Sequence, residues 1–174
     1  MLREPISFNQ FNLNILHAWN SGWFLLTAGD FSSGVYNTMT VSWGSMGIMW
    51  GKPFVQVVVR PQRHTYGFME THPTFTLCAF SAQYRDALNL LGIKSGRHGD
   101  KIAEAGLTPL ASTQVAAPGF AEAELVLECE KMYYDDLAPE HFLAGHIAHH
   151  YDHDFHRVYY GEIKAISATE NYRR

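Results

Sequence analysis

The sequence predicts a mainly β protein with a few short α-helices, built as an antiparallel barrel. Three observations favour this class. Short apolar runs have the two-residue period of strands, turn-forming residues separate them, and strand and helix do not alternate regularly. With 174 residues, 47% of them hydrophobic and 17% charged, the chain fits a single domain over residues 1–174 with a sizeable core.

The first predicted strands lie in the N-terminal half of the chain. Residues 23–28 form an apolar run that ends in a turn rich in glycine and serine. In residues 37–43, polar and apolar side chains alternate, and the polar face is suited to meet a ligand. Residues 54–59 are almost continuously apolar, as in a strand covered on both faces, and Pro61 stops that strand.

The second half of the chain continues the pattern. Residues 75–80 form a strand, and the apolar residues after it recur at helical spacing up to Gly92, where we expect the helix to end. Residues 123–133 alternate acidic and apolar side chains, and residues 156–168 form the last strand. The total is about six or seven strands and two to four short helices.

Charge and composition exclude several classes of function. The net charge of −4 provides no basic surface for a nucleic-acid backbone. No apolar stretch approaches ~20 residues, and the N-terminus lacks the features of a signal peptide. Cys78 and Cys129 have no second cysteine at metal-ligand spacing, which predicts buried thiols in a reducing compartment. We therefore expect a soluble cytoplasmic protein that binds neither nucleic acid nor membrane.

Two basic segments carry groups that bind phosphate. Residues 60–65 place Arg60, Arg63 and Thr65 directly after a buried strand, and arginine forms bidentate, charge-assisted hydrogen bonds with phosphate oxygens. Residues 95–101 add glycines and further donors ahead of a short helix. Taken alone, the first segment also fits a solvated basic turn, and the second segment also fits an ordinary helix entry. Their combination favours a phosphate site.

Six histidines lie between residues 141 and 156. His146 and His150, or His149 and His153, are four residues apart and would share a helix face, as zinc ligands often do. No HExxH motif is present. We interpret the tract as a partly exposed helix followed by a loop and predict no metal site, with a metal site as the alternative.

Several motifs stand in a particular order and spacing along the chain: residues 37–43, 52–53, 60–65, 91–101, 104–107 and 156–163. Together they resemble the flavin reductase-like family, especially its flavoredoxin branch, from about Trp19 to Ile166. The resemblance implies a homodimeric, FMN-binding split β-barrel, antiparallel and Greek-key-like. FMN would lie near the subunit interface, with the strand of residues 37–43 beside the isoalloxazine ring.

The resemblance also implies site residues. Those of the two basic segments would hold the ribityl chain and the phosphate, and those of residues 37–43 would lie beside the ring. His156 matches a histidine that in some relatives lies on the substrate side of the flavin, which makes it the candidate catalytic residue. The expected cofactor-binding residues are Asn37, Met39, Thr40, Val41, Ser42, Trp43, Arg60, Pro61, Arg63, Thr65, Ser95, Gly96, Arg97 and Lys101.

The activity implied is that of an FMN-dependent oxidoreductase of the NAD(P)H:flavin reductase type. Such a protein takes electrons from NADH or NADPH and passes them to a flavin, a metal chelate or a protein acceptor. One alternative is a flavoredoxin-type electron carrier that uses no nicotinamide. Another is a non-catalytic split barrel that binds a different planar ligand or none.

Overall fold

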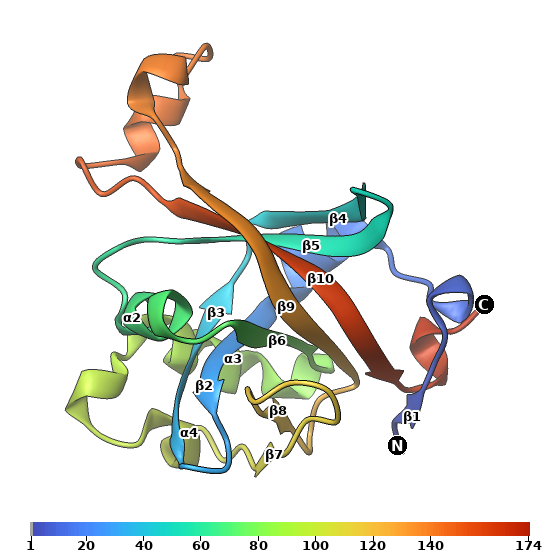
Figure 1. The fold of residues 1–174 in the computed structure, drawn as a ribbon. Helices are drawn as coiled ribbons and strands as arrows, with labels where there is room; N and C mark the ends of the chain where they lie inside the picture. The colour runs from blue at the N-terminus through green and yellow to red at the C-terminus, as the bar shows by residue number, and fades with distance from the viewer. Residues whose placement is uncertain (1) are drawn as a thin grey trace.

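The computed structural model describes residues 2–174 and is built around one strongly twisted antiparallel sheet (Figure 1). Seven strands follow the order β3-β2-β6-β9-β10-β5-β4, and β1 pairs with β10. The mainly β, antiparallel class predicted from the sequence is confirmed. The strands are β1 Glu4–Pro5, β2 Phe24–Asp30, β3 Val35–Val41, β4 Gly44–Met49, β5 Lys52–Val59, β6 Thr74–Ala79, β9 Leu125–Asp136 and β10 Arg157–Ala168.

The order of the strands leaves the barrel open on one side. The sheet begins at β3 and ends at β4, and these two strands follow each other in the chain without pairing along the described residues 2–174. The chain therefore passes from one edge of the sheet to the other through residues 42 and 43. This opening lies beside β3, the strand whose sequence predicted a ligand.

Short helices and a small second sheet surround the strands. Among the described residues, strands β7 and β8 pair only with each other. Among the residues that the structure describes, no helix has the length and apolar character needed to cross a membrane. The bounds are α1 Ile15–His17, α2 His64–Thr71, α3 Arg85–Ile93, α4 Lys101–Glu104, β7 Pro109–Leu110 and β8 Gly119–Phe120; a π-helical turn covers Ala18–Gly22, and 3-10 turns cover Phe8–Gln10, Ala82–Tyr84, Gly96–His98, Pro139–His141, Ile147–His150 and Glu170–Tyr172.

The core lies on both faces of β2 and β6, because their side chains alternate between two apolar clusters. Phe24 and Leu26 belong to the cluster inside the barrel, whereas Leu25 belongs to the cluster beneath α3. Inside the barrel, a Cβ atom at Gly161 would lie 2.5 Å from the ring of Phe75. A residue without a side chain therefore lets β10 and the Phe75 ring pack closely.

Several details differ from the sequence predictions. Gly92 does not end the helix after β6: α3 runs to Ile93, and a Cβ atom at Gly92 would lie 3.3 Å from Thr40. This glycine therefore permits close packing of α3 on β3. The helix predicted through the histidine tract is only the 3-10 turn Ile147–His150, so its histidines do not share an α-helical face. Strand β4 and helix α2 were not predicted.

Residues 137–156 connect β9 to β10 and project from one end of the sheet (Figure 1). The beginning and the end of this connection are tied together, because the backbone N–H of Leu137 donates to the carbonyl oxygen of His156 at 3.0 Å. The connection returns to the barrel beside the end of β5, where Arg157 pairs with Val59.

Candidate functional site

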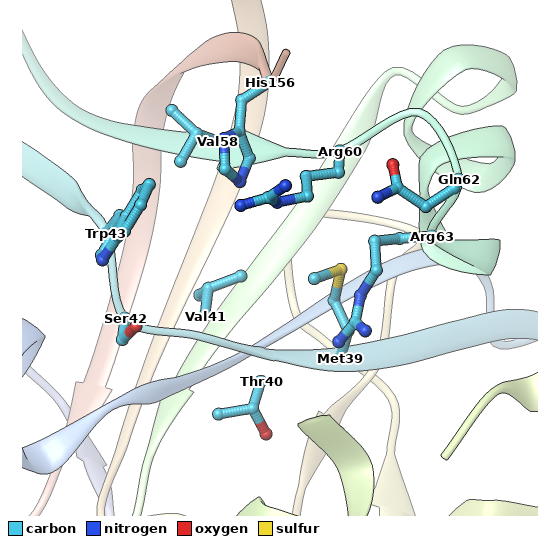
Figure 2. A pocket seen from close by; sticks show the side chains of 10 residues that line it. All are labelled: Met39, Thr40, Val41, Ser42, Trp43, Val58, Arg60, Gln62, Arg63 and His156. Atoms are coloured by element: carbon cyan, nitrogen blue, oxygen red, sulfur yellow. The ribbon is translucent and has the colours of Figure 1, made fainter. Parts of the chain in front are cut away.

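A pocket of about 410 Å³ lies at the open side of the barrel, between β3 and the end of β5. Figure 2 shows β3 along its floor and His156, the residue before β10, above it. The lining residues are Met39, Thr40, Val41, Ser42, Trp43, Val58, Arg60, Gln62, Arg63 and His156.

The apolar face of β3 supplies the side chains of the pocket floor. In Figure 2, Met39 and Val41 lie on the pocket side of the strand, whereas Thr40 points away from it. The Thr40 hydroxyl donates to the carbonyl oxygen of Leu88 in α3, and the Thr38 hydroxyl donates to that of Leu26 at 3.0 Å. The Thr40 hydroxyl therefore points away from the pocket, and Thr40 offers the pocket only its backbone.

A second, smaller pocket of about 140 Å³ adjoins the first, and Met39, Gln62 and Arg63 line both. It lies between the first turn of α2 and the 3-10 turn at Gly96–His98. The two basic segments predicted to bind phosphate therefore meet at this pocket. Its lining residues are Asn37, Met39, Gln62, Arg63, His64, Thr65, Ile93, Lys94, Ser95, Gly96, Arg97 and Lys101.

Hydrogen bonds fix the donors of the smaller pocket. The Thr65 hydroxyl accepts from Asn37 Nδ2 at 2.7 Å, so its own proton remains to be donated. Lys101 is only 4% exposed, and its Nζ donates to the carbonyl oxygens of Leu91 and Lys94, both at 2.9 Å, which leaves one of its three protons. The first backbone N–H groups of α2 also have no partner within the helix.

The positive charges at this pocket are poorly compensated. Within residues 2–174, no carboxylate forms an ion pair with Arg63, Arg97 or Lys101. Burial lowers the pKa of Lys101 to about 8, with repulsion from Arg63 as the second cause. Burial and then Arg97 and Lys101 lower the pKa of His64. The arrangement is therefore suited to bind an anion.

Arg60 differs from these cations, although it lines the larger pocket. Its guanidinium forms an ion pair with Asp154 and donates to the carbonyl oxygen of His150 at 2.7 Å. It also lies 5.1 Å from the centre of the Tyr151 ring. Arg60 thus joins the end of β5 to the β9–β10 connection.

His156 is 8% exposed and closes the pocket opposite β3. Its ring centre lies 5.3 Å from that of Trp43, and its Nδ1 lies 3.0 Å from the Tyr151 hydroxyl oxygen. Burial lowers the pKa of His156 to about 4, and the charge of Arg60 contributes second. The imidazole is therefore neutral at pH 7.

Of the predicted site residues, only Pro61 lies outside these two pockets; it lines a neighbouring surface hollow. Gln62, His64 and Val58 are lining residues to which the sequence assigned no role, although the first two belong to the basic segment 60–65.

In the part of the chain that the structure describes, the cysteines and histidines form no further site of this kind. Cys78 and Cys129 are buried, and neither forms a disulfide. Throughout residues 2–174, no group of three histidine, cysteine or carboxylate side chains is placed to hold a metal ion.

The chain is thus an open antiparallel barrel that carries, at its opening, a two-part pocket with an apolar floor and a cationic end. The sequence matches the family described as flavin reductase like domain over residues 16–174. The chain therefore belongs to the flavin reductase-like family. A comparison with curated proteins gave no match.

Solved structures share the fold. The flavoredoxin of Desulfovibrio vulgaris has a TM-score of 0.68 at 23% identity, with 95% of this chain and 77% of that one covered. An FMN-binding domain of a flavin reductase-like enzyme from Shewanella baltica gives 0.69 at 15% identity, covering 96% and 77%. An NADH:FAD oxidoreductase from Streptomyces globisporus gives 0.66 at 16% identity, covering 87% and 78%. Another neighbour is itself described as a split barrel, so the expected split-barrel fold is confirmed.

Proposed function

We propose that this chain binds FMN and works as an oxidoreductase that takes electrons from NADH or NADPH and passes them to a flavin, a metal chelate or a protein. The observation that carries the proposal is the two-part pocket. An apolar floor on β3 continues into a smaller pocket where, within residues 2–174, Arg63, Arg97 and Lys101 have no carboxylate partner. A ligand with a planar ring joined to a phosphate matches both parts, with the ring in the larger pocket and the phosphate in the smaller one.

The smaller pocket fits a phosphate monoester. Such a group carries about −1.5 to −2 charges at pH 7 and offers strong acceptor oxygens. Arg63 and Arg97 supply charged donors, Lys101 and the Thr65 hydroxyl supply one free proton each, and the first turn of α2 supplies backbone N–H groups. In this proposal Ser95 and Gly96 shape the opposite wall, and Arg60 acts mainly through the β9–β10 connection.

The larger pocket fits the ring of the flavin. When bound, FMN supplies a ring that accepts a hydride and releases electrons. Met39 and Val41 would pack against it and exclude water, and backbone groups of residues 40–42 would meet its polar edge. Trp43 is 44% exposed at the rim, and His156 faces it across the opening. A second reactant would enter there.

The relatives support two variants of the proposal. The name of the Streptomyces globisporus neighbour describes an NADH:FAD oxidoreductase, which favours use of a nicotinamide. The Desulfovibrio vulgaris neighbour is a flavoredoxin, which favours an electron carrier supplied by another protein. We adopt the first variant because Trp43, a planar side chain at the rim of the pocket, is 44% exposed and would contact a second planar molecule.

We further propose that the chain is a single cytoplasmic domain that forms a homodimer. Ile48 and Trp50, at the end of β4, are 62% and 64% exposed. The Trp50 ring lies 6.2 Å from that of Tyr133 and 6.4 Å from that of Tyr160. An exposed aromatic cluster of this kind is typical of a protein interface. Light scattering after size exclusion would give twice the chain mass for a dimer.

An absorption spectrum of the purified protein, recorded with FMN and then with NADH or NADPH in the absence of oxygen, tests the function. Visible flavin bands that bleach with the nicotinamide support the oxidoreductase. Bands that persist favour the electron carrier with a protein donor. A protein that does not bind FMN would contradict the flavin assignment altogether.

A further inference from the structure

His156, at the end of the β9–β10 connection, lines the larger pocket, and an aromatic cluster of the same connection lies behind it. The rings of Phe142, Tyr151 and Phe155 lie 5.1 to 5.8 Å apart. Tyr151 also meets His156 edge-on, with ring centres 5.5 Å apart. This cluster therefore places the Tyr151 ring directly behind the histidine that closes the pocket.

Polar contacts hold the same segment on the barrel. Asp154 accepts hydrogen bonds from Arg60 and from Gln62, both of which follow β5. The backbone N–H of Asp152 donates to the other carboxylate oxygen of Asp154 at 3.0 Å. Because Arg60 also contacts the Tyr151 ring, the position of Tyr151 is fixed from two sides.

The Tyr151 hydroxyl is the hydrogen-bond partner that bears on which nitrogen of His156 carries the proton. It lies 3.0 Å from Nδ1, and within residues 2–174 it has no other hydrogen-bond partner. If Nδ1 carried the proton, the hydroxyl proton would have no protein acceptor. If the hydroxyl donates to Nδ1, both groups are satisfied and Nε2 carries the proton. No protein group in the described chain bonds to Nε2, and Figure 2 shows the His156 ring directed into the pocket between Trp43 and Arg60.

We propose that Tyr151 is a positioning residue that holds His156 in its Nε2–H tautomer, so that a neutral hydrogen-bond donor faces the carbonyl oxygen of the second reactant. The carboxamide of a nicotinamide has such an oxygen. The assignment of this reactant rests on the proposed function, whereas the tautomer does not. A neutral donor suits a carbonyl because it binds oxygen without placing a charge beside Arg60.

The experiment compares the unsubstituted chain with Tyr151→Phe, which removes only the hydroxyl. Tyr133→Phe is the matched control, because its hydroxyl donates to Asp135 at 2.7 Å and does not line the pocket. Long-range ¹H–¹⁵N correlation spectra identify the tautomer of each histidine, and His156→Asn assigns the signal. These spectra need no flavin, so they decide the positioning role even if FMN binding fails.

We expect the Nε2–H tautomer in the unsubstituted chain and in Tyr133→Phe, and a mixture of tautomers in Tyr151→Phe. In steady-state assays Tyr151→Phe should raise the KM for NADH or NADPH by roughly threefold to tenfold, because one neutral hydrogen bond is lost. The Kd for FMN should not change. An Nδ1–H tautomer in the unsubstituted chain, or an unaltered tautomer in Tyr151→Phe, would overturn the positioning role. An altered tautomer with an unchanged KM would overturn the assignment of the second reactant.

Discussion

Replacing Arg63 with alanine isolates the interaction that distinguishes FMN from other planar ligands. The Arg63 side chain lines both pockets, and burial is the main cause that lowers its pKa, so its charge is poorly solvated before a ligand arrives. A charge-assisted hydrogen bond to phosphate is worth about 1.5–3 kcal/mol. The Kd for FMN should therefore rise about tenfold to a hundredfold.

The assay is a titration of flavin fluorescence with FMN and, in parallel, with riboflavin, which has the same ring and ribityl chain but no phosphate. Arg63→Ala should weaken FMN binding as stated and change riboflavin binding by no more than about twofold. Arg85→Ala serves as the control. Its guanidinium lies 4.1 Å from the Trp23 ring centre, and it lines neither pocket.

Arg63 also donates to the carbonyl oxygen of Gly92, so its removal affects stability as well as binding. Thermal unfolding of each variant without ligand separates the two effects. Equal weakening of FMN and riboflavin binding by Arg63→Ala would show that the arginine contacts no phosphate. The reasoning from the uncompensated cations would then fail.

Three further predictions concern the pocket and the core. FMN affinity should fall as the pH rises through about 8, because burial lowers the pKa of Lys101 to about 8 and the neutral amine no longer attracts phosphate; Lys101→Met should remove this dependence in the same titration. Gly96→Ala should weaken FMN binding roughly tenfold, because the added Cβ would lie 2.2 Å from Asn37 Oδ1, whereas Gly67→Ala, which meets no atom within 4 Å, should leave it unchanged. Burial raises the pKa of Cys78 to about 12, so a thiol reagent at pH 8 should modify this cysteine only after the protein unfolds. Mass spectrometry measures the modification, and rapid modification of Cys78 in the native protein would contradict its buried position.

The sequence predicted the parts of the fold in which local pattern and burial agree. The alternation along residues 37–43 and the apolar run before Arg60 both correspond to strands, β3 and β5. Strand β4 was missed because Gly44 and Gly47 interrupt its apolar pattern. The sequence does not predict helix α2, because its first residues, with Arg63 before them, belong to the basic segment whose pattern also fits a turn.

The site was predictable as two segments but not as contacts. The donors of residues 60–65 and 95–101 predict a phosphate site, and the fold brings the two segments together at the smaller pocket. The direction of the Thr40 hydroxyl depends on the packing of α3, which no local pattern encodes. Arg60 pairs with Asp154, which lies 94 residues later, so its role in holding the β9–β10 connection required the three-dimensional structure.

A crystal structure of the chain grown with saturating FMN tests the central claim most directly. The account predicts the isoalloxazine ring over Met39 and Val41, and the phosphate within hydrogen-bond distance of Arg63 and Arg97 at the first turn of α2. A phosphate bound elsewhere on the chain, or a pocket that stays without flavin at saturating FMN, would contradict it.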